Sequence, residues 1–178
     1  DNFGIMFYKD LQENIESVPG VVATAARVNT QGFIRTETAI ISLYLRGILP
    51  QEEIKVTKLK KYLIAGYLGS LDTDEDAIII GEELSDMLGV YLGDELELIS
   101  PTIKDIIKFK VAGIFKSGMY NYDLSLAFIS FARAQKLNNV FNVASAIGVR
   151  VDKLLAVDKV KRDILLKLGT SYNVRTWA

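Results

Sequence analysis

Three stretches of this chain alternate apolar and polar residues with a period of two, which is the pattern of strands that bury one face of a sheet. They are TAIISLYLRG at 38–47, ELELIS at 95–100 and IIKFKVAGIF at 106–115. The last two are separated by the short turn Pro101 to Asp105, so we expect them to form a hairpin. The run Val21 to Val28 supplies a partner for the first stretch, with turn residues Asn29 to Gly32 between the two strands.

Helical patterns lie between these strands. The opening stretch from Met6 to Val18 has apolar residues at helical spacing and ends at Pro19-Gly20, which predicts a first helix. Ala77 to Ile80 indicates a buried strand, and GEELSDMLG directly after it predicts a short helix with Gly89 as its terminator. The segment at 51–70 lacks sustained periodicity, so we expect a short helix or an irregular connection there.

The last third of the chain alternates strands and helices. Strands are expected at Leu126 to Ile129, Ala146 to Val151 and Tyr172 to Thr176, and helices at Phe131 to Leu137 and Leu155 to Leu168. This β-α-β-α-β order needs a sheet whose face the helices can cover, and the early strands can complete that sheet. The predicted fold class is therefore α+β, or a mixed α/β sandwich.

Composition limits what such a fold can do. With 178 residues, 49% of them hydrophobic, the chain can bury one packed core but is short for two independent domains. A formal net charge of -1 leaves no basic surplus, so nucleic acid is not an expected partner. The sequence contains no histidine and no cysteine, so any catalysis would depend on carboxylates, Lys, Tyr or Ser.

No apolar run approaches the roughly 18 residues that a membrane-spanning helix needs. The chain begins at Asp1 rather than at a methionine, and it ends at Trp177-Ala178, directly after the last expected strand. We therefore expect a fragment of a larger protein, whose flanking parts, including any membrane helices, lie outside this sequence.

One acidic segment, DTDEDAIIIGEE, places Asp72, Asp74, Asp76 and Glu83 at positions 1, 3, 5 and 12 of a calcium-binding loop. Position 6 of such a loop requires a glycine for its sharp turn, but here it is Ala77. A strand is expected where the loop should continue, and no expected helix pair frames the segment. The sequence predicts a solvated acidic loop without a metal, and a calcium-binding module is the alternative.

Two further patterns bear on catalysis. Glu82 and Glu83 are adjacent on an expected helix, so their side chains point about 100° apart and cannot flank one substrate bond. The stretch KSGMYNYDLS at 116–125 brings Ser, Tyr and Asp together, but the Ser-x-x-Lys and Tyr-x-x-x-Lys spacings are absent from it. We therefore expect no catalytic residue and no cofactor, and a binding or coupling role in place of an enzyme.

Two blocks of the sequence resemble the extracytoplasmic domain of ABC transporter permeases of the lipoprotein-releasing kind, LolC and LolE, within the broader MacB/FtsX class. They are AIIIGEELSDMLGVYLGDELELISP at 77–101 and, more specifically, FKVAGIFKSGMYNYDLSLAFISFARAQKL at 109–137. In such permeases a strand ending in Gly-Ile-Phe leads through Ser/Thr-Gly-x-Tyr-x-Tyr-Asp into a Phe-Ile-Ser strand and a helix that contains Ala-Gln. The terminal VRTW resembles the return of that domain to the membrane, and the resemblance covers most of the chain.

This resemblance implies a periplasmic domain of a bacterial inner-membrane protein, anchored by membrane segments absent from this sequence. It also implies partners, which are a cytoplasmic ABC ATPase subunit, a second permease, and a lipoprotein or a soluble lipoprotein chaperone. The implied function is non-catalytic coupling of ATP-driven permease motion to the release of lipoproteins from the inner membrane. The alternative within the class is a related efflux or signalling permease.

The resemblance further implies a two-lobed MacB-like domain. Both chain ends, 1–48 and 123–178, would form a porter-like α/β lobe, and the inserted segment 49–122 would form a smaller β-rich lobe. A structured crossover would return the chain to the first lobe. Its glycine would permit a tight turn, its tyrosines would bury their rings while their hydroxyls stay in water, and its aspartate would bond nearby backbone N–H groups. The crossover residues are Gly118, Tyr120, Tyr122 and Asp123.

The tip of the second hairpin is the predicted partner-binding site. Apolar side chains on an exposed tip favour contact with a partner, and the alternative is that they fold back onto their own sheet. In relatives that hold the chaperone, the resemblance implies a long, proline-containing hairpin loop, whereas the turn here is short. The predicted partner-binding residues are Thr102, Ile103, Lys104, Asp105 and Ile106.

Overall fold

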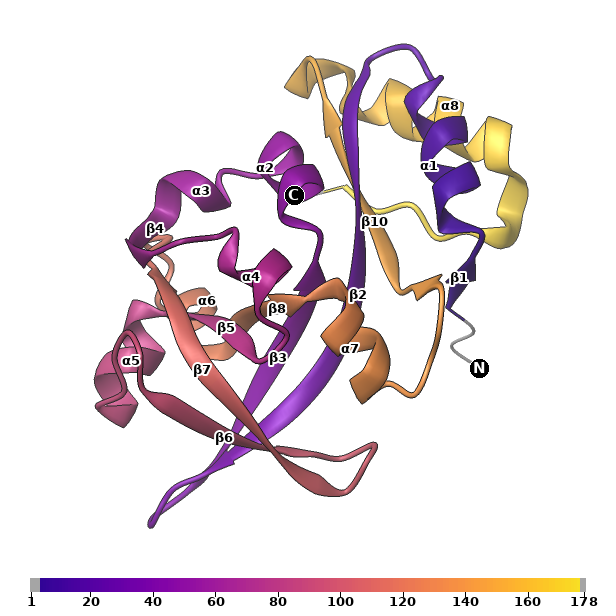
Figure 1. The fold of residues 1–178 in the computed structure, drawn as a ribbon. Coiled ribbons are helices and arrows are strands. Elements are labelled where there is room, and N and C mark those ends of the chain that lie inside the picture. The colour runs from indigo at the N-terminus through magenta and orange to yellow at the C-terminus, as the bar shows by residue number, and fades with distance from the viewer. Residues whose placement is uncertain (1–3, 177–178) are drawn as a thin grey trace.

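The computed structural model describes residues 4–176. Within this range the strands form one mixed sheet of eight strands and a separate two-stranded sheet (Figure 1). The strands are β1 Ile5–Met6, β2 Val21–Arg35, β3 Ile40–Ile48, β4 Leu63–Gly66, β5 Ala77–Gly81, β6 Glu95–Ser100, β7 Asp105–Phe115, β8 Leu126–Ser130, β9 Val143–Ala144 and β10 Ala146–Val151.

Short helices connect these strands and cover them. Two 3-10 turns, Leu154–Ala156 and Gly169–Ser171, flank the last helix. The helices are α1 Tyr8–Glu16, α2 Pro50–Val56, α3 Leu59–Tyr62, α4 Ser70–Thr73, α5 Glu82–Leu88, α6 Tyr120–Ser125, α7 Phe131–Leu137 and α8 Val157–Leu168.

The large sheet closes on itself. Its strand order is β10-β2-β3-β8-β5-β7-β4, and β6 pairs with both β2 and β7. The ring β2-β3-β8-β5-β7-β6 is completed where Phe33 of β2 lies opposite Ile99 of β6. The pairs β3-β8 and β5-β7 are parallel, and the other pairs are antiparallel. A closed ring leaves few exposed strand edges, which protects the domain from edge-to-edge association.

All six strands of the ring contribute to one hydrophobic core. Their inward residues include Leu45, Ile80, Leu98, Phe109 and Ile129, all less than about one-twentieth exposed. Alternate residues of β6 and β7 are buried in this cluster while their neighbours face water, as the period-two pattern predicts. β5 is buried on both faces, because a second cluster under α4 and β4 covers its outer side.

A third cluster joins the two ends of the chain. Leu11 and Ile15 of α1 pack against Val160 and Ile164 of α8, and Val149 of β10 lies beside them. β10 also pairs along β2, so the first and last parts of the described chain are held by both a sheet and a helix pair (Figure 1).

The predicted two-lobe division assigns neighbouring strands of one sheet to different lobes. β5, from the segment assigned to the inserted lobe, lies in the sheet between β7 and β8. It shares the ring's core with β3 and β8, which the prediction assigned to the porter-like lobe. The boundaries at residues 48 and 123 remain a prediction.

The predicted turn at Asn29 to Gly32 is wrong, because β2 continues through these residues to Arg35. Gly32 is buried within the strand, and a Cβ atom there would lie 3.4 Å from Leu45 and 3.5 Å from Leu98. The real turn follows at residues 36–39, where the hydroxyl of Thr36 accepts the N–H of Ala39 at 2.9 Å. Pairing with β3 from Arg27 to Arg35 therefore outweighs the local turn preference of the Asn-Thr-Gln-Gly sequence.

Two other expectations fail at the chain ends. Tyr172 to Thr176 is not a strand, and its Tyr172 and Val174 side chains pack on the third cluster instead. Met6 belongs to β1 and is 64% exposed, so it does not start the apolar face of the first helix. The other predicted helices and strands are present, and α7 and β10 have the predicted bounds.

Candidate interaction site

The turn between β6 and β7 is closed by its own backbone. Ser100 lies opposite Asp105, and the N–H of Lys104 donates to the carbonyl oxygen of Ser100 at 2.9 Å. Lys104 adopts a left-handed conformation with φ 53°, which lets the chain reverse in few residues. The N–H of Ile106 donates to Asp105 Oδ1 at 2.7 Å. Because these bonds lie within the turn, the side chains of Ile103, Lys104 and Ile106 remain available for contact.

The side chains of this tip face solvent. Residues 101–106 are all exposed, Thr102 among them, with Ile103 at 43% and Ile106 at 58%. Neither isoleucine folds back onto the sheet, which was the alternative to an interaction surface. Ile99 lies directly opposite Ile106 and is itself 37% exposed, so the tip presents three apolar side chains together.

Sequence reasoning missed Ile99 as part of this tip. The signal was present, because the alternation in ELELIS places Ile99 on the same outward face as Glu95 and Glu97. On that face Lys108 pairs with Glu95 at 2.8 Å and with Glu97 at 3.2 Å. These carboxylates, Glu95 first, raise the pKa of the Lys108 ammonium above its usual range. The outer face of the hairpin therefore changes from charged at its base to apolar at its end.

The crossover after β7 is built around Asp123. Its carboxylate is 2% exposed and accepts the N–H of Ser117 at 3.0 Å, the hydroxyl of Ser117 at 2.5 Å and the N–H of Gly118 at 3.2 Å. Gly118 has φ 85°, which glycine adopts without strain. Tyr122 packs in the second core cluster, whereas Tyr120 is 61% exposed. The aspartate and glycine roles are therefore confirmed, and the expected burial of Tyr120 is wrong.

The acidic segment is spread over separate elements. Asp74 Oδ1 accepts the N–H of Asp76 at 3.0 Å, and the Asp76 carboxylate pairs with Arg133 at 3.1 Å. Asp72 lies on α4 and Glu83 on α5. Among residues 4–176 no group of three or more acidic side chains is arranged to hold a metal ion. The absence of bound calcium remains a prediction.

The fold is that of the extracytoplasmic domains of ABC-type permeases. The chain superposes on the extracellular domain of the noncanonic ABC-type transporter YknZ from Gram-positive bacteria with a TM-score of 0.61 and 17% identity, covering 95% of this chain and 86% of that one. The periplasmic region of MacB from Actinobacillus actinomycetemcomitans gives a TM-score of 0.59 and 14% identity, covering 94% of this chain and 76% of that one. The predicted MacB-like α+β class is therefore confirmed. No family model matches this chain.

Sequence similarity identifies a particular relative within this class. The chain is 31% identical over 170 residues to the lipoprotein-releasing system transmembrane protein LolC of Xylella fastidiosa (strain 9a5c), which is 89% of this chain and 40% of LolC. It is 30% identical over 138 residues to LolC of Neisseria meningitidis serogroup B (strain ATCC BAA-335 / MC58), covering 73% of this chain and 33% of that protein. The resemblance to lipoprotein-releasing permeases is therefore confirmed, and the chain spans at most two-fifths of the length of these relatives.

None of the described helices combines the length and the apolar character needed to cross a bilayer.

Proposed function

We propose that this chain is the periplasmic domain of a bacterial inner-membrane ABC permease that releases lipoproteins. The observation that carries the proposal is the 31% identity to LolC across 89% of the chain. The domain itself is non-catalytic. It couples permease motion, driven by a cytoplasmic ATPase subunit and shared with a second permease, to the release of lipoproteins from the inner membrane.

The construction of the domain supports a coupling role. The two ends of the described chain are joined by the pairing of β2 with β10 and by the packing of α1 on α8. A displacement imposed at either end must therefore move the sheet ring as a body, because packed cores transmit strain and resist gradual deformation. Such a body suits the transfer of motion from membrane helices to a periplasmic partner.

We also propose that the tip Thr102 to Ile106 contacts the lipoprotein or its soluble chaperone. Ile103 and Ile106, with Ile99 beside them, give an apolar centre, and Lys104 and Asp105 border it with one charge of each sign. An apolar centre with a polar rim is the usual composition of a protein interface.

A domain exchange tests the function. The chain replaces the corresponding segment of a LolC permease, which is reconstituted in proteoliposomes with its second permease and ATPase, and ATP-dependent transfer of a lipoprotein to soluble chaperone is measured. We expect transfer above that of a permease whose periplasmic segment is deleted. ATP hydrolysis equal to the parent with no lipoprotein transfer would contradict the proposal.

A related efflux or signalling permease is the second candidate. The observation that favours it is the superposition on the extracellular domain of the ABC-type transporter YknZ and on the periplasmic region of MacB. The same exchange made in a MacB-type permease distinguishes the two. Recovery of transport there, together with failure in LolC, would assign this chain to the efflux class.

A further inference from the structure

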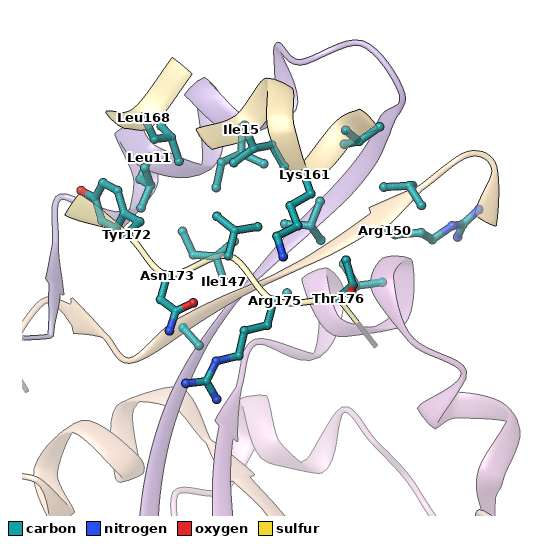
Figure 2. A pocket seen from close by; sticks show the side chains of 18 of the residues that line it. Leu11, Ile15, Ile147, Arg150, Lys161, Leu168, Tyr172, Asn173, Arg175 and Thr176 are labelled. Carbon is teal, nitrogen blue, oxygen red and sulfur yellow. The ribbon is translucent and has the colours of Figure 1, made fainter. Parts of the chain in front are cut away.

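A cavity of about 590 Å³ opens between the two ends of the chain, away from the hairpin tip. Figure 2 shows that it lies under α1 and α8, with β10 as its floor and residues 172–176 along one side. Its volume falls within the range of roughly 300–1,000 Å³ that is typical of small-molecule sites. It is far larger than a packing defect, because interiors leave few voids bigger than a water molecule.

The walls of this pocket are apolar. Leu11 and Ile15 of α1, Ile164 of α8, and Ile147 and Val149 of β10 line it. The floor residues Ile147 and Val149 are only half buried, so apolar surface remains open to an occupant. At the mouth, Leu154 lines the pocket and is 89% exposed, and the next residue, Leu155, is fully exposed. Apolar walls that continue onto an exposed apolar rim fit a hydrocarbon chain.

All the charged residues that line the pocket are cationic. They are Arg27, Arg150, Lys161 and Arg175, and no described lining residue is a carboxylate. The guanidinium of Arg27 pairs with the carboxylate of Glu53, with Nη2 and Oε1 2.8 Å apart. Lys161 and Arg175 make no ion pair within residues 4–176, and Figure 2 shows the Lys161 side chain extending from α8 toward the segment that carries Arg175.

We propose that this pocket binds a single-chain amphiphile with an anionic headgroup. The hydrocarbon chain lies between α1, α8 and β10, and the headgroup meets Lys161 and Arg175. The two halves of the ligand match two features of the site. The apolar walls favour the hydrocarbon chain, and the cations Lys161 and Arg175 favour an anionic headgroup over a neutral or positive one. The inference does not depend on the transport role, because it rests on the cavity and its charges alone.

Calorimetric titration of the 178-residue chain with dodecanoate, below its micelle concentration, tests the proposal. We expect one saturable site, much weaker binding of dodecanol, and no binding of dodecyltrimethylammonium. Dodecyl phosphate is the second anionic probe, and whichever anion binds more tightly identifies a carboxylate or a phosphate headgroup. Equal affinity for dodecanol and dodecanoate, or the absence of a saturable site for both anions, would overturn the proposal.

Three variants locate the binding. Lys161→Gln should weaken dodecanoate binding by about tenfold, as expected for loss of one charge-assisted contact. Lys159→Gln, on the exposed face of the same helix, is the matched control and should leave affinity unchanged. Val149→Phe fills the floor and should abolish binding while thermal unfolding confirms that the variant is folded. Binding that survives Val149→Phe in a folded protein would show that the amphiphile associates elsewhere and would also reject the site.

Discussion

The guanidinium of Arg27 on β2 binds the carboxylate of Glu53 on α2 at two points, Nε to Oε2 at 3.0 Å and Nη2 to Oε1 at 2.8 Å. The Glu53 side chain is 1% exposed and that of Arg27 is 11% exposed. Next to this pair, Glu52 Oε2 accepts the N–H of Ala26 and the side-chain amide of Gln12, both at 2.9 Å. Two adjacent glutamates therefore tie α2 to β2 and to α1.

Removal of one partner from this buried pair should lower the free energy of unfolding substantially. Glu53→Gln leaves the Arg27 guanidinium without its countercharge, and we expect a loss of about 3 kcal/mol in the free energy of unfolding. Glu97→Gln, in an exposed pair with Lys108, should cost less than about 0.5 kcal/mol. Urea unfolding measures both variants. Equal losses would mean that the buried pair contributes no more than the surface pair.

The stability of the crossover at residues 116–125 should depend on the Asp123 carboxylate. Asp123→Ala leaves two N–H groups and the Ser117 hydroxyl without their acceptor, so we expect a loss of about 2 kcal/mol. Asp158→Ala on the exposed face of α8 is the control for removal of a negative charge. Chemical unfolding of both variants checks this, and an unchanged midpoint for Asp123→Ala would show that solvent satisfies these donors equally well.

Gly81 should tolerate no side chain. A Cβ atom there would lie 2.0 Å from the carbonyl oxygen of Asp123, which is backbone and cannot move without shifting α6. We expect Gly81→Ala to destabilise the protein by about 3 kcal/mol. Gly89 has φ 63° and open space around it, so Gly89→Ala should cost only about 1 kcal/mol of backbone strain. Thermal unfolding should rank the two variants in this order, and the reverse order would contradict the close approach of α6.

The acidic segment should bind no calcium. Its ligand candidates lie on α4, a turn and α5, and position 6 of the would-be loop is alanine. Calorimetry with calcium chloride should therefore show no saturable heat. A micromolar affinity that is lost in Asp74→Ala would prove the alternative, a calcium-binding module.

The hairpin tip should matter for binding and not for stability. Because Ile103 and Lys104 are exposed, their joint replacement by Ser should change the free energy of unfolding by less than about 0.5 kcal/mol. Affinity for the purified chaperone or lipoprotein should fall by at least about tenfold if the tip is a contact centre.

The neighbouring hairpin supplies a matched control for the tip. Glu37→Ser with Ile40→Ser also removes one charge and one exposed isoleucine, with Ile40 at 67% exposure. It should alter neither stability nor affinity. A tip variant that lowers the melting temperature while binding stays intact would make the tip a packed part of the scaffold.

Local periodicity determined much of this fold in advance. The alternation around Leu43 and Leu45 predicted a strand that buries one face, and the strand and helix that contain Ala146 and Phe131 have the predicted bounds. The sequence also placed Ile103 and Ile106 at the end of a short hairpin, but their exposure, as against folding back onto the sheet, came from the structure. These features depend on residues near one another in sequence, so a pattern of period 2 or 3.6 suffices to find them.

Only the tertiary structure decided where strands end and which ones meet. β2 runs past Asn29 to Gly32 because β3 pairs with it from Arg27 to Arg35, whereas Tyr172 to Thr176 packs by its side chains and pairs with no strand in the described chain. The ring closes at Phe33 and Ile99, and the pocket forms where Ile15, Val149 and Lys161 meet. These residues are far apart in sequence, and the free energy of their contacts is set by packing and burial, which no local pattern records.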